Sequence, residues 1–283
     1  MRYLPDTAAY AFFDRVADLS WSRRTKGARR LRANLARVVP EADDATLDEL
    51  ARQGLRSYFT YWCDAFRLSD WDSTRVNRIE VRDEHHLWQA LAAGGGAVGA
   101  VPHMGNWDHA GAWCTAHGVA VTTVAERLKP EAVYRRFLEF RQGLGMTIYP
   151  LTGGDTDVMA TLADHVRAND FVPLLADRDL TARGIPVSFF GEQASMPAGP
   201  AALALRTGAP LVPLSTWFVG RSPDHTLVLQ FDAPVQVPAT GSTREKAAAM
   251  TQRLADVFAG RIVDHPEDWH MLQKLFTADL TPR

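Results

Sequence analysis

From His85 onward, short apolar runs alternate with segments of helical pattern, and this alternation limits the possible folds more than any other feature. Apolar runs that suit strands cover 97–101, 119–125, 146–149, 171–176, 187–190, 211–216 and 226–231. Segments that suit helices cover 106–117, 130–144, 155–168, 198–207 and 243–263. Strands separated by helices form mostly parallel sheets that helices cover on both faces. The sequence therefore predicts an α/β core over residues 85–276.

Residues 1–67 show a helical pattern, with a capped start at Asp6 and a break near residues 39–40. Within this region an apolar stretch, residues 10–19, precedes a basic cluster. The basic cluster consists of Arg23, Arg24, Lys26, Arg29, Arg30, Arg32 and Arg37. An apolar segment followed by basic residues is typical of an anchor on an anionic membrane surface. The same pattern fits a helix packed on the core with its basic face in solvent, so both interpretations stay open.

The composition favours an ordinary globular protein. The chain has 283 residues, of which 46% are hydrophobic and 23% charged, and no linker-like stretch divides it, which favours one domain over residues 1–283. The net charge of −2 argues against a nucleic-acid partner. We expect no membrane-spanning helix, because no run of about 18 apolar residues occurs. We expect no secretion signal either, because the early apolar segment contains Asp6, Asp14, Arg15 and Asp18. Cys63 and Cys114 are expected to be buried thiols in a cytoplasmic protein.

The segment 101–108, Val-Pro-His-Met-Gly-Asn-Trp-Asp, is the first candidate for chemistry. Residues five apart lie on different sides of a regular helix, so His103 and Asp108 cannot pair on one helix. The pair would lie across a turn from strand to helix, with Gly105 giving the turn its conformational freedom. A carboxylate that holds one imidazole nitrogen leaves the other free to accept a proton, which suits acyl transfer. A histidine that merely caps the next helix is the alternative.

Other polar residues follow the neighbouring strands. Glu126 and Arg127 come after one strand candidate, and Asp177 and Arg178 come after another. Parallel sheets bind ligands beyond the carboxyl ends of their strands, so these residues should converge on His103. Asp177 or Glu126 could therefore orient the imidazole in place of Asp108.

Several blocks occur in an order that resembles a known family. They are His103-Met-Gly-Asn-Trp-Asp108, Ala125-Glu-Arg-Leu-Lys-Pro130, Asp177-Arg-Asp179, Gly184 before Val187-Ser-Phe-Phe-Gly191, and Met196-Pro-Ala-Gly-Pro200. This order resembles the bacterial lipid A late acyltransferase family, and within it the actinobacterial phosphatidylinositol mannoside acyltransferases. The resemblance implies a general base at His103 and its acid at Asp108, with Arg127, Arg141 and Arg178 near the substrate groove.

The resemblance also implies the reaction and its location. A fatty acyl group, palmitoyl from palmitoyl-CoA, would pass to a mannose hydroxyl of a phosphatidylinositol mannoside. Such an enzyme needs no cofactor, binds acyl-CoA and a glycolipid, and works as a peripheral protein on the cytoplasmic face of an anionic membrane.

The residues favour direct transfer over a covalent intermediate, because no Gly-x-Ser-x-Gly turn is present. Backbone N–H groups near Gly105 and Asn106, or the side chain of Arg178, could stabilise the oxyanion. Glu126 and Arg141 could form an ion pair that shapes the groove.

Two other functions compete with acyl transfer. A metal-dependent hydrolase could use the histidines and Asp108 as ligands, although their spacing is poor for a metal site. The candidate ligands are His85, His86, His103, Asp108, His109 and His117. A noncatalytic lipid carrier would share an apolar pocket and a basic rim but would not need His103. Residues 265–276 are expected to form a short amphipathic helix, with His265 and His270 facing solvent or capping.

Overall fold

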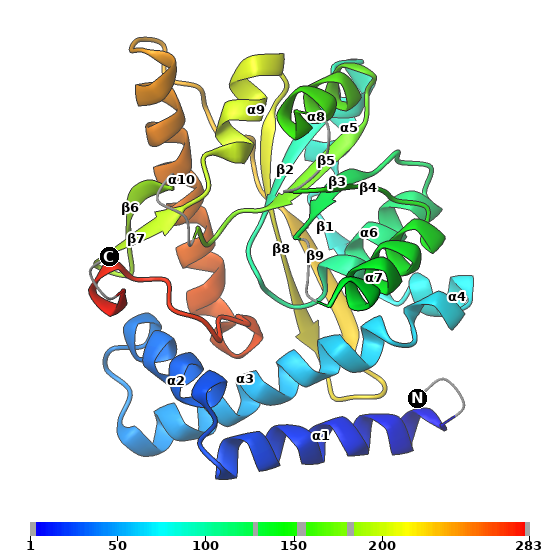
Figure 1. Ribbon diagram of the computed structural model, residues 1–283, viewed down its shortest axis with the longest axis vertical. Coiled ribbons are helices and arrows are strands. Elements are labelled where there is room, and N and C mark those ends of the chain that lie inside the picture. The colour runs from blue at the N-terminus through cyan, green and yellow to red at the C-terminus, as the bar shows by residue number, and fades with distance from the viewer. Residues whose placement is uncertain (1–3, 127–129, 152–156, 180–183, 281–283) are drawn as a thin grey trace.

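The computed structural model describes residues 4–126, 130–151, 157–179 and 184–280. Its central sheet has five strands in the order β1-β9-β8-β2-β5 (Figure 1). The strands are β1 (Ile79–Arg82), β2 (Ala97–Val101), β5 (Phe171–Leu175), β8 (Leu211–Val219) and β9 (Thr226–Phe231). Within this sheet β2 runs parallel to both β5 and β8, β1 runs parallel to β9, and β8 and β9 form an antiparallel pair. The mostly parallel α/β sheet predicted from the sequence is confirmed.

Two pairs of strands extend this arrangement. The parallel strands β3 (Thr122–Ala125) and β4 (Thr147–Pro150) continue beyond β5 through a bridge between Val121 and Phe171. The strands β6 (Ile185–Phe189) and β7 (Glu192–Met196) form an antiparallel hairpin. The strand patterns at β1 and β7 were not predicted, because each is short and carries polar side chains at alternate positions.

Helices cover both faces of the sheet. In β2, Val98 and Ala100 point into the core beneath α8 (Val158–Arg167), α9 (Gly199–Thr207) and α10 (Thr243–Asp264). The alternate residues Ala97 and Val101 point to the opposite face. That face is covered by α5 (His85–Ala92), α6 (Trp107–Ala116) and α7 (Glu131–Gly143). Strand β2 is therefore buried on both sides, which explains its continuous apolar sequence.

The N-terminal region is helical, as predicted. It consists of α1 (Asp6–Ser22), α2 (Lys26–Val38) and α3 (Asp44–Ala65), followed by the short helices η1 (Leu68–Asp70) and α4 (Ser73–Val76). The predicted break is confirmed, since α2 ends at Val38 and Asp43 caps α3. The predicted cap at Asp6 is wrong. Asp6 is the first helical residue, and its carboxylate instead accepts hydrogen bonds from Arg67 and Arg75.

The C-terminal segment differs from its prediction. Residues 265–276 contain only the single turn η2 (Pro266–Asp268) and then run in an irregular path to η3 (Thr277–Asp279). Met104 forms a bridge with Trp269, and Ala194 forms one with Phe276. These bridges use backbone groups that a helix would keep for itself, so long-range pairing outweighs the local helical pattern.

Candidate active site

The strand-to-helix turn predicted around Gly105 is present between β2 and α6. Gly105 has a φ of 57°, a left-handed value that glycine adopts at little cost. A Cβ atom on Gly105 would lie 2.4 Å from the carbonyl oxygen of Thr216. The turn therefore packs directly against β8, and a side chain at this position would force the turn and His103 out of place.

His103 pairs with Asp177, which lies just beyond the end of β5. The Nδ1 atom of His103 lies 2.5 Å from Oδ1 of Asp177, and the backbone N–H of His103 donates to Oδ2 at 3.0 Å. The indole N–H of Trp269 donates to the same Oδ2 at 3.0 Å. Burial raises the pKa of Asp177, but the charge of His103 and the hydrogen bonds from His103 and Trp269 outweigh it and hold the pKa below its usual value. Asp177 is thus a fully buried carboxylate dedicated to His103.

The other imidazole nitrogen of His103 is available. Its Nε2 atom has no hydrogen-bond partner in the part of the chain that the structure describes, and the side chain is 20% exposed. Because Nδ1 donates to a carboxylate, Nε2 carries a lone pair directed away from Asp177. The ring of Trp107 meets His103 edge-on at 5.7 Å. The pair has the arrangement of a general base and its orienting acid.

Asp108 has a different set of contacts. It is 2% exposed and accepts hydrogen bonds from Nε of Arg141 at 2.7 Å and from the hydroxyl of Tyr61 at 3.0 Å. Burial lowers the pKa of Arg141, but the nearby charge of Asp108 raises it more. Asp108 therefore joins α6 to α7 and α3. The suggested ion pair of Arg141 with Glu126 is not the one found, because Glu126 is exposed after β3 while Asp108 is enclosed beside Arg141.

Of the remaining predicted residues, Asn106 follows β2 and Arg178 follows β5. Asn106 is buried and caps α6 by accepting the backbone N–H of His109, while its Nδ2 donates to Asp64 at 3.1 Å. Arg178 is half-buried next to Asp177. Arg127 lies outside the described residues.

The backbone amides suggested as oxyanion donors are already used. The N–H of Gly105 donates to the carbonyl of Asp268 at 3.0 Å, and the N–H of Asn106 donates to Oγ1 of Thr216 at 3.0 Å. Of the groups suggested from the sequence, the side chain of Arg178 is the one that stays a candidate.

A buried carboxylate that the sequence did not reveal contacts the turn between β2 and α6. Asp64 on α3 accepts hydrogen bonds from Tyr10 on α1, from Asn106, and from Nε2 of His225 at 3.1 Å. Asp64 is fully buried, and its three partners come from separate elements. Asp64 falls on the core side of an amphipathic helix. A charged residue on that side was the one signal in the sequence that could have drawn attention to it.

A second polar cluster lies behind His103. Oγ of Ser57 lies 2.8 Å from Nε2 of His270 and also contacts Asp268, whose Oδ2 accepts the N–H of Phe218 at 3.0 Å. Burial raises the pKa of Asp268 to about 7 and lowers that of His270 to about 3. The N–H of His270 donates to the carbonyl of His103 at 2.7 Å. The expectation that His270 faces solvent or caps a helix is wrong, because the C-terminal segment crosses the turn instead of forming a helix.

The proposed metal ligands do not gather. Among the described residues, no three histidine, cysteine, aspartate or glutamate side chains come together in a way that could hold a metal ion. His109 points Nε2 at the carbonyl of Val76, at 2.8 Å, and His117 points Nδ1 at the carbonyl of Trp113, at 2.8 Å. These histidines serve the ends of α4 and α6.

A family model described as bacterial lipid A biosynthesis acyltransferase matches residues 1–278. A protein of Mycolicibacterium smegmatis named phosphatidylinositol mannoside acyltransferase is 44% identical over 282 residues, covering 99% of this chain and 89% of that protein. A protein of the same name from Mycobacterium tuberculosis strain H37Rv is 44% identical over 284 residues, covering 99% of this chain and 86% of that protein. These matches confirm the resemblance carried by the ordered sequence blocks.

Proposed function

Because the chain belongs to the bacterial lipid A biosynthesis acyltransferase family, we propose that it transfers a fatty acyl group from acyl-CoA to a hydroxyl of a glycolipid. The names of the relatives favour a phosphatidylinositol mannoside as acceptor, with a mannose hydroxyl as nucleophile and palmitoyl as the acyl group. The observation that carries the proposal is the buried contact of Asp177 with His103, which leaves Nε2 of His103 free.

In the proposed reaction His103 acts as general base. Its Nε2 atom takes the proton of the acceptor hydroxyl while the hydroxyl oxygen attacks the thioester carbonyl. The tetrahedral oxyanion then collapses, the carbon–sulfur bond breaks, and the imidazolium returns the proton to the departing coenzyme A thiolate. Proton removal of this kind typically gives about 10²–10⁴-fold in rate. Asp177 stabilises the imidazolium in between.

The other candidate residues have supporting roles in this proposal. Arg178, beside Asp177, would stabilise the oxyanion, and Glu126, at the end of β3, would contact substrate together with Arg127. Asp108, Arg141 and Asn106 hold α6 in position through their buried contacts.

We also propose that the protein works as a peripheral protein on the cytoplasmic face of the membrane. No described helix is long and apolar enough to span a bilayer. Helix α1 lies along one edge of the molecule, outside α3 (Figure 1), and its outer side carries large exposed apolar residues. We call Leu4, which precedes α1, Phe12, Leu19 and the neighbouring Phe66, which follows α3, the α1 apolar face. Exposed apolar residues of this size support contact with lipid.

The basic cluster is a weaker candidate for this contact. Four of its arginines form ion pairs within the protein: Arg24 with Asp48, Arg30 with Asp279, Arg32 with Asp44 and Asp48, and Arg37 with Glu192 and Asp279. These pairs favour the interpretation of α2 as a helix packed on the core.

The test is an assay with palmitoyl-CoA and a panel of glycolipids that includes phosphatidylinositol mannosides, with products identified by mass spectrometry. We expect the wild-type protein to acylate a mannoside and His103→Ala to lose activity by at least about 10²-fold. His117→Ala is the matched control, because His117 lies at the far end of α6, and it should keep full activity. Near-normal turnover by His103→Ala, with its circular dichroism unchanged, would contradict the proposed base.

A further inference from the structure

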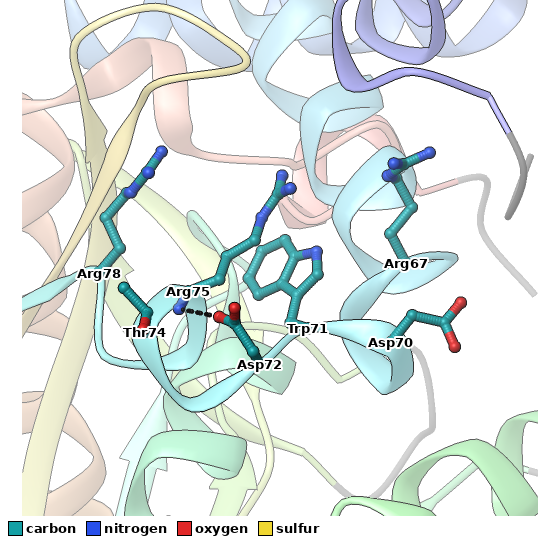
Figure 2. A pocket seen from close by; sticks show the side chains of 7 residues that line it. All are labelled: Arg67, Asp70, Trp71, Asp72, Thr74, Arg75 and Arg78. Carbon is teal, nitrogen blue, oxygen red and sulfur yellow. Dashed lines mark hydrogen bonds between the residues drawn. The ribbon is translucent and has the colours of Figure 1, made fainter.

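A cavity away from His103 has the features of a binding site. It has a volume of about 390 Å³ and lies at the end of α3, over η1 and α4 (Figure 2). Its lining consists of Arg67, Asp70, Trp71, Asp72, Thr74, Arg75 and Arg78. This volume is within the usual range for small-ligand sites, of roughly 300–1,000 Å³. No residue assigned to the acyl-transfer site lines it.

The charges of the cavity are separated. Figure 2 shows the guanidinium groups of Arg67, Arg75 and Arg78 on one side, and the carboxylates of Asp70 and Asp72 on the other side of the Trp71 ring. The carboxylate of Asp72 is occupied in part, since it accepts the backbone N–H of Arg75 at 2.8 Å. The two sides therefore differ in charge, with the arginines forming a cationic wall.

The arginines of the cationic wall also contact acids outside the cavity lining. One carboxylate, Asp6, is shared between Arg67 and Arg75. Arg78 has Asp224 at 3.7 Å, but both side chains are exposed, and exposed pairs contribute little. Of the two arginines nearest the Trp71 ring and α4, Arg75 thus has a close carboxylate and Arg78 a distant one. An anion on this side of the cavity would lie next to both guanidinium groups (Figure 2).

Trp71 supplies an independent sign of a ligand. Its Nε1 atom is buried and has no hydrogen-bond partner within residues 4–126, 130–151, 157–179 and 184–280. An indole N–H can only donate, and a buried donor without an acceptor costs free energy. Figure 2 shows this nitrogen directed toward the space between Arg67 and Arg75. An oxygen acceptor in the cavity would satisfy it.

The cavity lies beside the α1 apolar face. Phe66 immediately precedes Arg67, and Nη1 of Arg67 donates to the carbonyl of Leu4 at 3.0 Å. Phe66 stacks on Phe13 at 6.2 Å, and Phe13 contacts Phe12 edge-on at 5.6 Å. The exposed apolar side chains and the cationic wall therefore meet at Arg67. If the apolar face rests on a bilayer, the cavity is at the level of the lipid headgroups.

We propose that this cavity binds the phosphate of an anionic phospholipid headgroup, with Arg78, Arg75 and the Trp71 N–H as donors to its oxygens. Arginine and N–H donors suit a phosphate group, and one bound lipid would fix the orientation of the protein on the membrane. The proposal rests on the membrane contact proposed above, and it adds a defined lipid site to it.

Binding of the full chain to vesicles, measured by co-sedimentation, tests this proposal. One set of vesicles contains phosphatidylcholine alone, and the other also contains phosphatidylglycerol. Trp71→Phe keeps an aromatic side chain and the net charge but removes the N–H, and Arg78→Gln removes one guanidinium. We expect each variant to bind the anionic vesicles about fivefold more weakly than wild type and the neutral vesicles equally well.

Arg244→Gln is the matched charge control, because Arg244 lies in the first turn of α10, far from α4 (Figure 1). It should bind both vesicle types like wild type. An equal loss in Arg244→Gln and Arg78→Gln, or unchanged binding by Trp71→Phe, would overturn the proposal, since either result indicates diffuse charge attraction. Circular dichroism of each variant checks that the fold is kept.

Soluble glycerophosphate separates a lipid headgroup from a free phosphate. It should compete with anionic vesicles for the wild-type protein and have no effect on the residual binding of Trp71→Phe. Binding of glycerophosphate is also measured by calorimetry. If Trp71→Phe abolishes that binding, and glycerophosphate does not compete with vesicles for the wild-type protein, the cavity binds a soluble phosphate instead. If the wild-type protein binds neither kind of vesicle, the lipid site is refuted. The proposed acyl transfer is tested separately, by comparing wild type with His103→Ala in detergent.

Discussion

At the scale of single residues, the sequence predicted His103 as the base but left its acidic partner open among Asp108, Asp177 and Glu126. In the structure, Nδ1 of His103 contacts Asp177, 74 positions away, while Asp108 is enclosed with Arg141 and Tyr61. The five-residue spacing gave a physical reason to doubt Asp108, since it separates the two side chains around the turn. Choosing Asp177 over Glu126 required the lateral order of the strands, which no local pattern contains.

Substituting the two aspartates should separate orientation from support. Asp177→Asn keeps the shape of the side chain but removes the charge that stabilises the imidazolium, so we expect kcat to fall by roughly 10⁴-fold with little change in KM. Asp108→Asn leaves Arg141 buried without its charge partner, so we expect the free energy of unfolding to fall by about 3–5 kcal/mol. Steady-state kinetics and urea unfolding of both variants measure these effects. If both variants lose the same factor in kcat and the same free energy of unfolding, Asp177 and Asp108 do not have different roles.

At the scale of elements, the longer predictions succeeded where one face of the element is plainly apolar. The helices α6, α8, α9 and α10 lie within a few residues of their predicted ranges. Residues 265–276 failed because their helical spacing is outweighed by contacts with distant segments. Trp269 reaches Asp177, and His270 reaches both Ser57 and the backbone of His103. A local pattern cannot report partners about 90 to 210 positions away.

The cluster of Ser57, Asp268 and His270 gives the stability of the protein a testable dependence on pH. Asp268 has a pKa of about 7 in the folded protein against the ordinary aspartate value of 3.8, so the folded state holds a proton that the unfolded state loses. The contribution of Asp268 to stability therefore falls as the pH rises between these values. His270 has a pKa of about 3 against 6.5, so the unfolded state holds the extra proton, and its contribution falls as the pH drops. The two effects oppose each other in wild type.

Replacing either Asp268 or His270 should reveal the pH dependence that the other residue gives to stability. Asp268→Asn should lose stability as the pH falls from about 6.5 to about 4, whereas His270→Gln should gain stability over the same range, each by at most about 1.4 kcal/mol per pH unit. Urea unfolding at several pH values measures both slopes, and Asn and Gln can keep hydrogen bonds to Ser57. Slopes of the same sign in the two variants would show that the groups do not titrate as described.

At the scale of the whole molecule, the alternation of strands and helices was sufficient to predict the layers of the core. The role of the N-terminal region was harder to predict, because the same basic residues fit a membrane surface or an ion-paired helix. The positions of Asp44, Asp48, Glu192 and Asp279 decide between these for the paired arginines. The apolar residues that stay exposed on α1 were also hidden in the sequence, since they alternate with the buried ones.

The two candidate membrane surfaces can be separated by one pair of variants. Phe12 is 48% exposed, so Phe12→Ser should weaken binding to vesicles by about fivefold, because about half of a phenylalanine side chain contributes about 1 kcal/mol. Arg32→Gln removes a basic residue already paired with Asp44 and Asp48, so vesicle binding should change by less than about twofold and the unfolding temperature should drop slightly. Vesicle co-sedimentation and thermal unfolding measure the two effects. If Arg32→Gln weakens vesicle binding and Phe12→Ser does not, the protein contacts the membrane through the basic cluster and not through the α1 apolar face.

The route of the chain through the candidate active site has a consequence for how the protein acquires activity. His103, Asp177 and Trp269 come from three distant parts of the sequence, and contacts between distant parts close late because their loops are costly in entropy. Helices α1 to α3 can gain their local structure well before that closure. During renaturation, recovery of turnover should therefore trail recovery of the far-ultraviolet helical signal. The enzymatic assay would then time the last step, in which the segments that carry His103, Asp177 and Trp269 come together.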